Sequence, residues 1–218
     1  RIHQETIEEV DSELVELSLT RSGRWRKWNL LAGLYLQRER YDSIGFGYAE
    51  DTAYSTLLYP SLWAQYKNGD DANYPRRGHG LTFEVRGGSD ALGSDVDFMS
   101  LRAEGRYVRG LGPDNRLILR AELGTLLVDD YLSLPPSQRF FAGGDKSVRG
   151  YDYKEIGERP GVTIIDDDGD VIDPVYGGKY LAVASVEFEH MFTREWGGAV
   201  FVDAGDAWDT EFKPEVGV

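Results

Sequence analysis

The densest group of potential metal ligands in the sequence is an acidic run at residues 166–170, Asp-Asp-Asp-Gly-Asp. Carboxylate oxygens are the ligands that calcium prefers, and the EF-hand loop is their best-known arrangement. An EF-hand loop beginning at Asp166 would need glycine at its sixth position and glutamate at its twelfth, where Val171 and Gly177 stand. The run is therefore predicted to be a solvated acidic hairpin in a long loop, with weak cation binding as the alternative.

No other group of side chains has the spacing of a catalytic site. Asp203-Ala204-Gly205 resembles the Asp-Thr-Gly of aspartic proteases, but those enzymes need a second aspartate and a hydroxyl where Ala204 stands. Gly45-Phe46-Gly47 is followed by Glu50, where a dinucleotide-binding loop needs glycine. The three histidines are scattered, at His3, His79 and His190. We predict that the protein is not an enzyme and holds no metal or cofactor. A barrel protease or lipase is the alternative, without a catalytic group to support it.

The composition excludes several classes of protein. The formal net charge is −14 and the isoelectric point is about 4.6, whereas affinity for nucleic acid needs clustered Lys and Arg. We therefore expect no nucleic-acid partner. Cysteine is absent, which excludes disulfides, zinc–thiolate sites and thiol nucleophiles. Hydrophobic residues make up 41% of the chain, which is enough to argue against disorder.

Targeting and membrane-spanning helices leave no signal in the sequence. The chain opens at Arg1-Ile2-His3-Gln4 without the apolar core of a signal peptide. This indicates that it begins inside a longer protein or after processing. No window approaches the roughly 18 consecutive apolar residues of a membrane-spanning helix.

Apolar and polar residues alternate along most of the chain, which is the period of a β-strand. In residues 99–107, Met99 and Leu101 alternate with Arg102 and Glu104. The alternation predicts about eight strands, near 12–20, 28–39, 55–66, 80–88, 96–109, 116–128, 180–192 and 197–206.

The connections between the predicted strands alternate in length. Short ones are expected near 21–27, 110–115 and 193–196, and long ones near 40–54 and 129–178. Short turns at one end and long loops at the other are typical of an outer-membrane barrel. Aromatic residues near the strand ends favour interfacial girdles: Trp25, Trp28, Tyr41, Tyr59, Trp63, Tyr131, Trp196 and Trp208.

The polar face of these strands carries a row of mixed charge, formed by Arg102, Glu104, Arg106, Arg120 and Glu122. In a soluble β-sandwich this row would be the solvated face. The opposite face of Leu, Ala, Gly, Tyr and Val suits either lipid or a packed core. The alternation by itself therefore leaves a barrel and a sandwich open.

The longest connection carries a recognisable motif. Residues 139–153 read RFFAGGDKSVRGYDY, which resembles the signature loop of the bacterial surface-antigen superfamily of outer-membrane assembly factors, TamA being the most similar branch. The tip is Val148-Arg149-Gly150-Tyr151, and its flank contains Arg139, Phe140, Gly143, Gly144 and Asp145. Residues 185–190 and 201–208 resemble the next two strands of the superfamily, and residues 75–78 resemble the opening of an earlier strand.

This resemblance implies an all-β, antiparallel up-and-down transmembrane barrel of sixteen strands. Residues 1–218 are expected to be part of the C-terminal barrel domain, and 129–178 a long extracellular loop that folds back into the lumen. The eight predicted strands would be the sixth to the thirteenth. A partial barrel has two open edges, so we expect it to close with further residues, pair with another copy or be held by a partner.

The resemblance also implies that the tip arginine pairs with an acidic residue on the strands after the loop. Val200 and Val202 share one face of their strand, so Asp203 points to the other, and Glu187 does so by the same parity. Arg149 with Asp203 is therefore the lead pair and Glu187 the second candidate, since a carboxylate can accept the planar guanidinium in bidentate fashion. Gly150 would permit a tight turn. A solvated Arg149 on a surface loop is the alternative.

The function implied by the resemblance is the insertion of autotransporters or other β-barrel proteins into the outer membrane of a Gram-negative bacterium. The implied partners are outer-membrane lipids, these client proteins and an inner-membrane TamB-like protein. One alternative is an export pore of the two-partner secretion type. The other is a passive structural barrel, which is disfavoured because porins lack the Val-Arg-Gly-Tyr loop.

Overall fold

The computed structural model describes residues 2–7, 10–45, 48–159, 164–165, 171–172, 174–193 and 195–218. Within these ranges, ten strands form one sheet and two short strands form a separate pair. The large sheet contains β1 (Ile2–Ile7), β2 (Val10–Trp25), β3 (Trp28–Gly45), β4 (Tyr48–Gly69), β5 (Arg77–Gly88), β6 (Phe98–Leu111), β7 (Asn115–Val128), β10 (Tyr180–Met191), β11 (Gly197–Trp208) and β12 (Glu215–Gly217). The separate pair is β8 (Ile164–Ile165) with β9 (Val171–Ile172).

Each strand of the large sheet pairs antiparallel with the next strand in the chain, apart from the step from β7 to β10. The order runs from β1 at one edge to β12 at the other. This is an open, up-and-down, all-β sheet of the kind that part of a barrel would form, so the predicted fold class is confirmed. Helical structure is confined, in the described residues, to the 3₁₀ turns η1 (Asp90–Leu92) and η2 (Pro136–Gln138). No described helix has the length and apolar character to cross a membrane.

All eight predicted strands are present, as β2 to β7, β10 and β11. The predicted long connection near 40–54 is wrong, because β3 and β4 continue pairing through this stretch, with Tyr41 opposite Ala53. Apolar alternation fades there while the backbone hydrogen bonds continue, since those bonds need no apolar side chain. The predicted turn near 21–27 shortens to residues 26–27 for the same reason.

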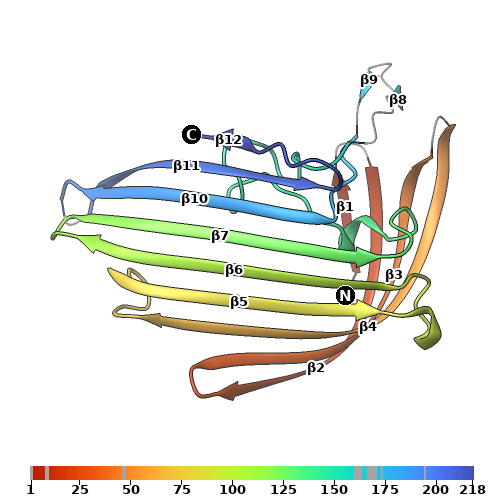
Figure 1. The fold of residues 1–218 in the computed structure, drawn as a ribbon, viewed down its shortest axis with the longest axis horizontal. Helices are drawn as coiled ribbons and strands as arrows, with labels where there is room; N and C mark the ends of the chain where they lie inside the picture. The colour runs from red at the N-terminus through yellow and green to blue at the C-terminus, as the bar shows by residue number, and fades with distance from the viewer. Residues whose placement is uncertain are drawn as a thin grey trace.

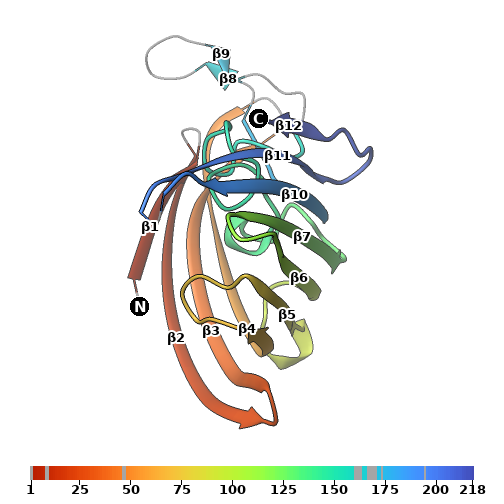
Figure 2. The ribbon, with the colours of Figure 1, turned by 90° about the vertical axis from the view of Figure 1, so that its left-hand side faces the viewer.

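The sheet is strongly curved, and its two ends differ (Figure 1, Figure 2). Connections 26–27, 70–76, 112–114 and 192–196 lie at one end, on the left in Figure 1. The longer connections 89–97 and 129–179 lie at the other end. Of the 129–179 segment, which we call the loop, residues 129–159 turn back against the concave side of the sheet, whereas β8 and β9 extend away from it (Figure 2).

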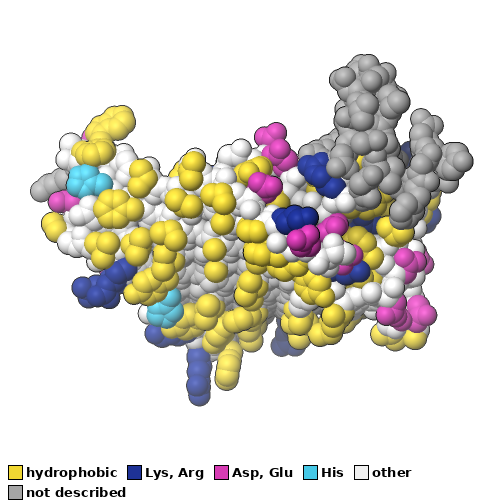
Figure 3. Space-filling view, turned by 45° about the horizontal axis from the view of Figure 1, so that its top comes forward, with side chains coloured by type: hydrophobic (Ala, Val, Ile, Leu, Met, Phe, Trp, Pro, Cys, Tyr) yellow, Lys and Arg dark blue, Asp and Glu magenta, His cyan; other side chains and the backbone are white. Residues whose placement is uncertain are grey.

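The two faces of the sheet separate the alternating residues. On β6, Ser100 is buried on the concave face, whereas Met99 is 44% exposed on the convex face. The convex face is apolar across the sheet and includes Leu17, Leu19, Leu34, Leu36, Leu62, Phe83, Leu119, Leu123, Val186, Val200 and Val202, all exposed. Part of this outer surface, with its spread of hydrophobic side chains, is visible in Figure 3. An apolar surface of this extent is stable against lipid rather than against water.

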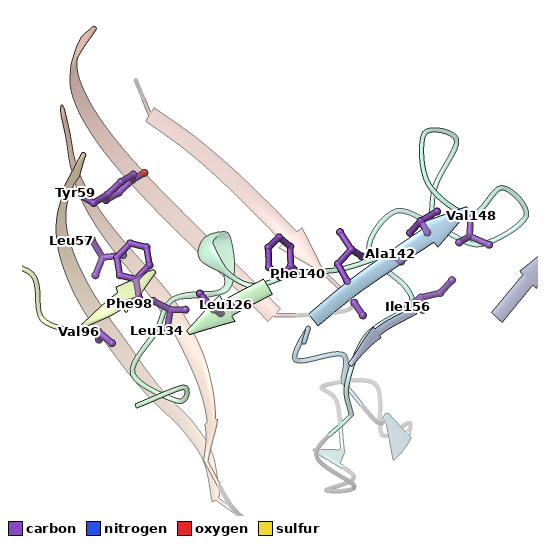
Figure 4. Packing of buried hydrophobic residues seen from close by; sticks show 13 residues of the cluster. Leu57, Tyr59, Val96, Phe98, Leu126, Leu134, Phe140, Ala142, Val148 and Ile156 are labelled. Atoms are coloured by element: carbon purple, nitrogen blue, oxygen red, sulfur yellow. The ribbon is translucent and has the colours of Figure 1, made fainter. Parts of the chain in front are cut away.

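The packed core lies on the opposite, concave face, between the sheet and the loop (Figure 4). Strand residues such as Leu57, Phe98 and Leu126 meet loop residues such as Leu134 and Phe140, all 5% exposed or less. A soluble sandwich would instead pack the leucine-rich convex face against a second sheet. That alternative is wrong, because the loop supplies the second layer and leaves the convex leucines exposed.

Two residues predicted to belong to an aromatic girdle have another place. Tyr41 and Tyr59 are each 4% exposed on the concave face. The Tyr41 hydroxyl donates to the backbone carbonyl of Ser133 in the loop, 3.3 Å away. The girdle prediction is wrong for these two residues, because an aromatic side chain near a strand end can lie on either face of the sheet. Trp25 and Trp196, by contrast, are exposed at the short-turn end.

The convex face gives a direct test of its lipid contact. We predict that Leu123→Arg, on the convex face of β7, lowers the free energy of unfolding in bilayers or micelles by about 2–4 kcal/mol. Thr82→Arg is the control, because Thr82 lies on the concave face beside an open cavity, where arginine stays hydrated. Urea unfolding of the full-length protein measures both. Equal effects of the two substitutions would contradict the assignment of the faces.

Candidate functional site

Arg149 at the loop tip is held by two carboxylates on neighbouring strands. Its Nε lies 2.6 Å from Oδ2 of Asp203 on β11, and its Nη2 lies 2.9 Å from Oδ1 of the same residue. Its Nη1 lies 2.5 Å from Oε2 of Glu187 on β10. The backbone N–H of Arg149 also donates to Asp203 Oδ2, at 3.1 Å. Sequence analysis proposed Asp203 as the first partner of Arg149 and Glu187 as the second. In the structure both carboxylates bind Arg149.

Neutral and aromatic groups complete the surroundings of the guanidinium. Arg149 Nη2 donates to the hydroxyl of Ser185 at 3.2 Å, and the guanidinium carbon lies 3.5 Å from the ring centre of Phe201. This stacking suits arginine, whose planar charge is weakly hydrated. Arg120 on β7 also donates to Ser185 and lies 3.8 Å from Asp203. Two arginines and two carboxylates therefore balance one another on the concave face.

Asp203 is the most strongly enclosed member of this cluster, at 0% side-chain exposure, whereas Arg149 is 19% and Glu187 is 16% exposed. An ionised carboxylate without water costs several kcal/mol unless it is paired and hydrogen-bonded. The bidentate guanidinium and the Arg149 N–H meet this need from the loop. Because the buried Asp203 carboxylate is stable only with these donors, it holds the tip against β11.

The backbone of the tip is shaped to deliver Arg149 to this position. Val148 is fully buried beside the arginine. Gly143, Gly144 and Gly150 have positive φ values of 99°, 92° and 94°. Residues with a Cβ atom rarely adopt this backbone conformation. The tip closes on itself, because the Gly144 N–H donates to the carbonyl of Tyr151 at 3.1 Å.

Strand β12 lies directly over the tip. A Cβ added at Gly217 would overlap the carbonyl oxygen of Arg149, so the approach of the two backbones depends on glycine. Tyr151 donates from its hydroxyl to Oε2 of Glu215, 2.8 Å away on the same strand. Asp203 and Gly217 are partners in the pairing of β11 with β12. The tip is thus bonded to β10, β11 and β12, with Gly150 left exposed.

The flank of the motif builds the loop itself rather than the tip contact. Arg139 is buried, and its Nε donates to the carbonyl of Leu134 at 2.9 Å. Its guanidinium also lies 4.8 Å from the ring centre of Tyr131. Burial raises the pKa of the Tyr131 hydroxyl above its usual value, and this hydroxyl donates to the carbonyl of Gly177 at 2.6 Å. These contacts close the base of the loop.

Phe140 fastens the same flank to the sheet. Its ring lies so close to Gly124 of β7 that an added Cβ would stand 2.7 Å from it, and its backbone bridges to Gly178. Asp145, by contrast, is exposed. An open cavity of about 890 Å³ adjoins the tip on the concave face, and its lining includes Lys146 and the charged residues Arg106 and Glu122.

Two contacts were missed by sequence analysis. The first lies between β3 and the η2 turn of the loop, where Ser137 donates a hydrogen bond to Glu39 and Gln138 donates one to Gln37. The alternation of Glu39 and Gln37 with apolar residues was visible in the sequence, but nothing there indicated that the loop reaches β3. The second is the ion pair of Glu189 on β10 with Arg116 on β7, which sequence analysis did not predict.

The acidic run 166–170 lies outside the described residues. Within the described part of the chain, no group of three or more His, Asp or Glu side chains is arranged to hold a metal.

Three comparisons with known proteins bear on this arrangement. The profile of the Omp85 superfamily domain matches residues 6–215. The outer membrane protein assembly factor BamA of Nitratidesulfovibrio vulgaris (strain Hildenborough) is 31% identical over 147 residues, which cover 63% of this chain and 17% of that protein. The crystal structure of BamA from Haemophilus ducreyi lacking POTRA domains 1–3 superposes with a TM-score of 0.77 at 18% identity. That superposition covers 92% of this chain and 43% of the other, and at this identity it shows the fold alone. The matches cover less than half of the length of each relative.

The energetic weight of the tip contact can be measured by a double-mutant cycle. We predict that Arg149→Ala lowers the free energy of unfolding by about 3 kcal/mol, because Asp203 would stay buried with only a distant Arg120. Arg149→Ala combined with Asp203→Ala should cost less than the sum of the single changes. Lys213→Ala is the control, since its ion pair with Glu211 is exposed at both ends and should contribute less than about 1 kcal/mol. Additive effects would show that the pair is not coupled.

The glycine over the tip gives a second test. Gly217→Ala should displace the tip, because the new methyl group would overlap the Arg149 carbonyl. We expect faster proteolysis of residues 145–152 in the folded full-length protein. Gly23→Ala serves as the control, since no atom lies within 4 Å of a Cβ added there. Unchanged proteolysis in Gly217→Ala would mean that β12 does not confine the tip.

Proposed function

The chain belongs to the Omp85 superfamily, and on that premise we propose that it forms part of the barrel of an outer-membrane protein assembly factor. The protein resides in the outer membrane of a Gram-negative bacterium, as its BamA homologues do. Lipid would cover the exposed leucines and valines of the convex face. The activity itself is the insertion of β-barrel client proteins into that membrane, and it requires no catalytic group.

Within this function, we assign residues 129–178 to an extracellular loop that folds into the barrel lumen. The single observation that carries the assignment is the bonding of Arg149 to Asp203 and Glu187. A loop lying only on the outer surface could not place Arg149 beside the fully buried carboxylate of Asp203 on β11. Residues 1–218 would then be a partial barrel domain with its lumen-facing loop in place.

The loop would act by holding neighbouring strands in one arrangement. Arg149 bridges β10 and β11, Tyr151 reaches β12, and the loop core packs on β4, β6 and β7. Client insertion needs a strand edge at which an incoming strand can pair. Such an edge belongs to the barrel as a whole, and this segment would set the curvature and rigidity of the wall beside it.

A narrower proposal concerns the clients. The motif at 139–153 resembles TamA, so autotransporters are the clients and an inner-membrane TamB-like protein is the partner that we would test first. The relatives named above are BamA proteins, for which a broader set of β-barrel clients is the alternative. Pull-down of the full-length protein with a TamB-like chain distinguishes the two.

One observation favours a second candidate function, a protein-export pore of the two-partner secretion type. The cavity beside the tip is open and lined by charged side chains of both signs, as a hydrated passage would be. Conductance of the full-length protein in planar bilayers separates the candidates, because a pore should open steadily when the tip contact is lost.

The proposed function predicts a defect in client assembly. Asp203→Ala or Arg149→Ala in the full-length protein should reduce the amount of folded client barrel in the outer membrane several-fold, while the variant itself still reaches the membrane. Lys213→Ala, which removes only an exposed ion pair with Glu211, should leave assembly near its normal level. The readout is the yield of folded client in reconstituted proteoliposomes. Normal assembly by both tip variants would refute the role proposed for the loop.

A further inference from the structure

Glu39 of β3 is a fully buried carboxylate far along the sheet from Asp203. Its side chain is 0% exposed. Oε1 accepts a hydrogen bond from the Ser12 hydroxyl at 2.7 Å, and Oε2 accepts one from Nε2 of Gln37 at 2.8 Å. Between β3 and β10 in the sheet stand β4, β5, β6 and β7. Glu39 therefore belongs to a different wall of the curved sheet from the site at the tip.

The remaining hydrogen bonds to Glu39 come from the loop. The Ser137 hydroxyl donates to Oε2, and the Ser137 backbone N–H lies 3.4 Å from Oε1. No Lys or Arg of the described residues forms an ion pair with this carboxylate. A buried carboxyl group without a cation depends on hydrogen-bond donors for its stability. The loop provides two of the four donors found here, so the carboxyl group and the loop stabilise each other.

The loop presents Ser137 from a rigid element. Residues Pro136–Gln138 form the 3₁₀ turn η2, which follows Pro135, and proline restricts the backbone on both sides of this start. Gln138 is 2% exposed and donates to Oε1 of Gln37 at 2.7 Å. The Tyr59 hydroxyl donates to the same oxygen at 3.1 Å. Side chains from β2, β3 and β4 thus form one hydrogen-bonded site that holds the η2 turn.

We infer that Glu39 is a positioning residue that anchors the first part of the loop, residues 131–140, to β3, independently of the tip anchor at Asp203. The loop then spans the concave face between two walls, fixed by one buried carboxylate at each. The tip anchor uses a cation, whereas the Glu39 anchor uses neutral donors and a shaped turn. Each anchor can therefore be disturbed without removing the chemistry of the other.

The role of this anchor deepens the proposed function, because it rests on the loop being the element that holds the barrel wall in place. A loop fixed at one end only could swing while its tip stayed bound. With both anchors formed, β3 and β11 are coupled through the loop as well as through the sheet. The docking of residues 131–140 on β3 can be measured without a client protein.

The test is hydrogen–deuterium exchange of the full-length protein in micelles, followed by mass spectrometry. In Glu39→Ala, amides in residues 131–140 should exchange at least about tenfold faster, because a hydrogen-bonded charged group is removed from the docked state. Amides in the strands β5 to β7 should keep their normal exchange. Glu84→Ala is the matched control, since Glu84 lies on the concave face of β5 and, among the described residues, forms no hydrogen bond or ion pair with the loop.

A second variant keeps the test decisive should Glu39→Ala fold poorly. Ser137→Ala removes the loop donor and leaves the strand intact, so it should accelerate exchange in the same segment to a smaller degree. The double variant should barely exceed the effect of Glu39→Ala, the larger of the two, because Ser137→Ala removes a bond that Glu39→Ala has already removed. Unchanged exchange in 131–140, or a uniform rise through β5 to β7 as well, would overturn the inference. A selective rise together with normal client assembly would support the anchor and count against the proposed role of the loop.

Discussion

The burial of Asp203 is the constraint on which the rest of the arrangement depends. A carboxylate with no exposure on β11 must be neutralised and hydrogen-bonded, or it destabilises the sheet by several kcal/mol. The sheet supplies part of this through Ser185 and a distant Arg120. The bidentate contact comes from Arg149, and that contact requires the loop to run along the concave face. The position of the loop therefore follows from the pairing of Arg149 with the buried Asp203 carboxylate.

The hydrophobic effect acts on the two faces in opposite ways. On the convex face, leucine and valine stay exposed because lipid is their expected surroundings. On the concave face, the apolar cluster is buried where the loop covers it, as Leu57, Phe98 and Leu126 are by Leu134 and Phe140. Without the loop these residues would face a polar interior. The loop is therefore a structural layer of the domain, and its loss would expose the core.

Two kinds of contact hold this layer in place, and they differ in specificity. The packing of Phe140 on Gly124 depends on shape, whereas Arg149 and Ser137 reach carboxylates whose donors must arrive at defined angles. Glu39 and Asp203 stand on strands separated by several others. A loop bound to both constrains the curvature between them, which is the property that a barrel wall beside a client-binding edge would need.

The sequence alone determined eight strands of the large sheet, the alternation of side chains between their two faces and the candidates for the tip pair. Each of these follows from the period of two, which is a local property, and from a motif of contiguous residues. The sequence could not determine that β3 and β4 extend past residue 40, since backbone pairing there continues without apolar alternation. It could not place Glu39 beside Ser137, or Gly217 over Arg149, because these contacts depend on the path of the loop across the concave face. That path is decided by tertiary packing between residues that lie 54 to 98 positions apart in the sequence.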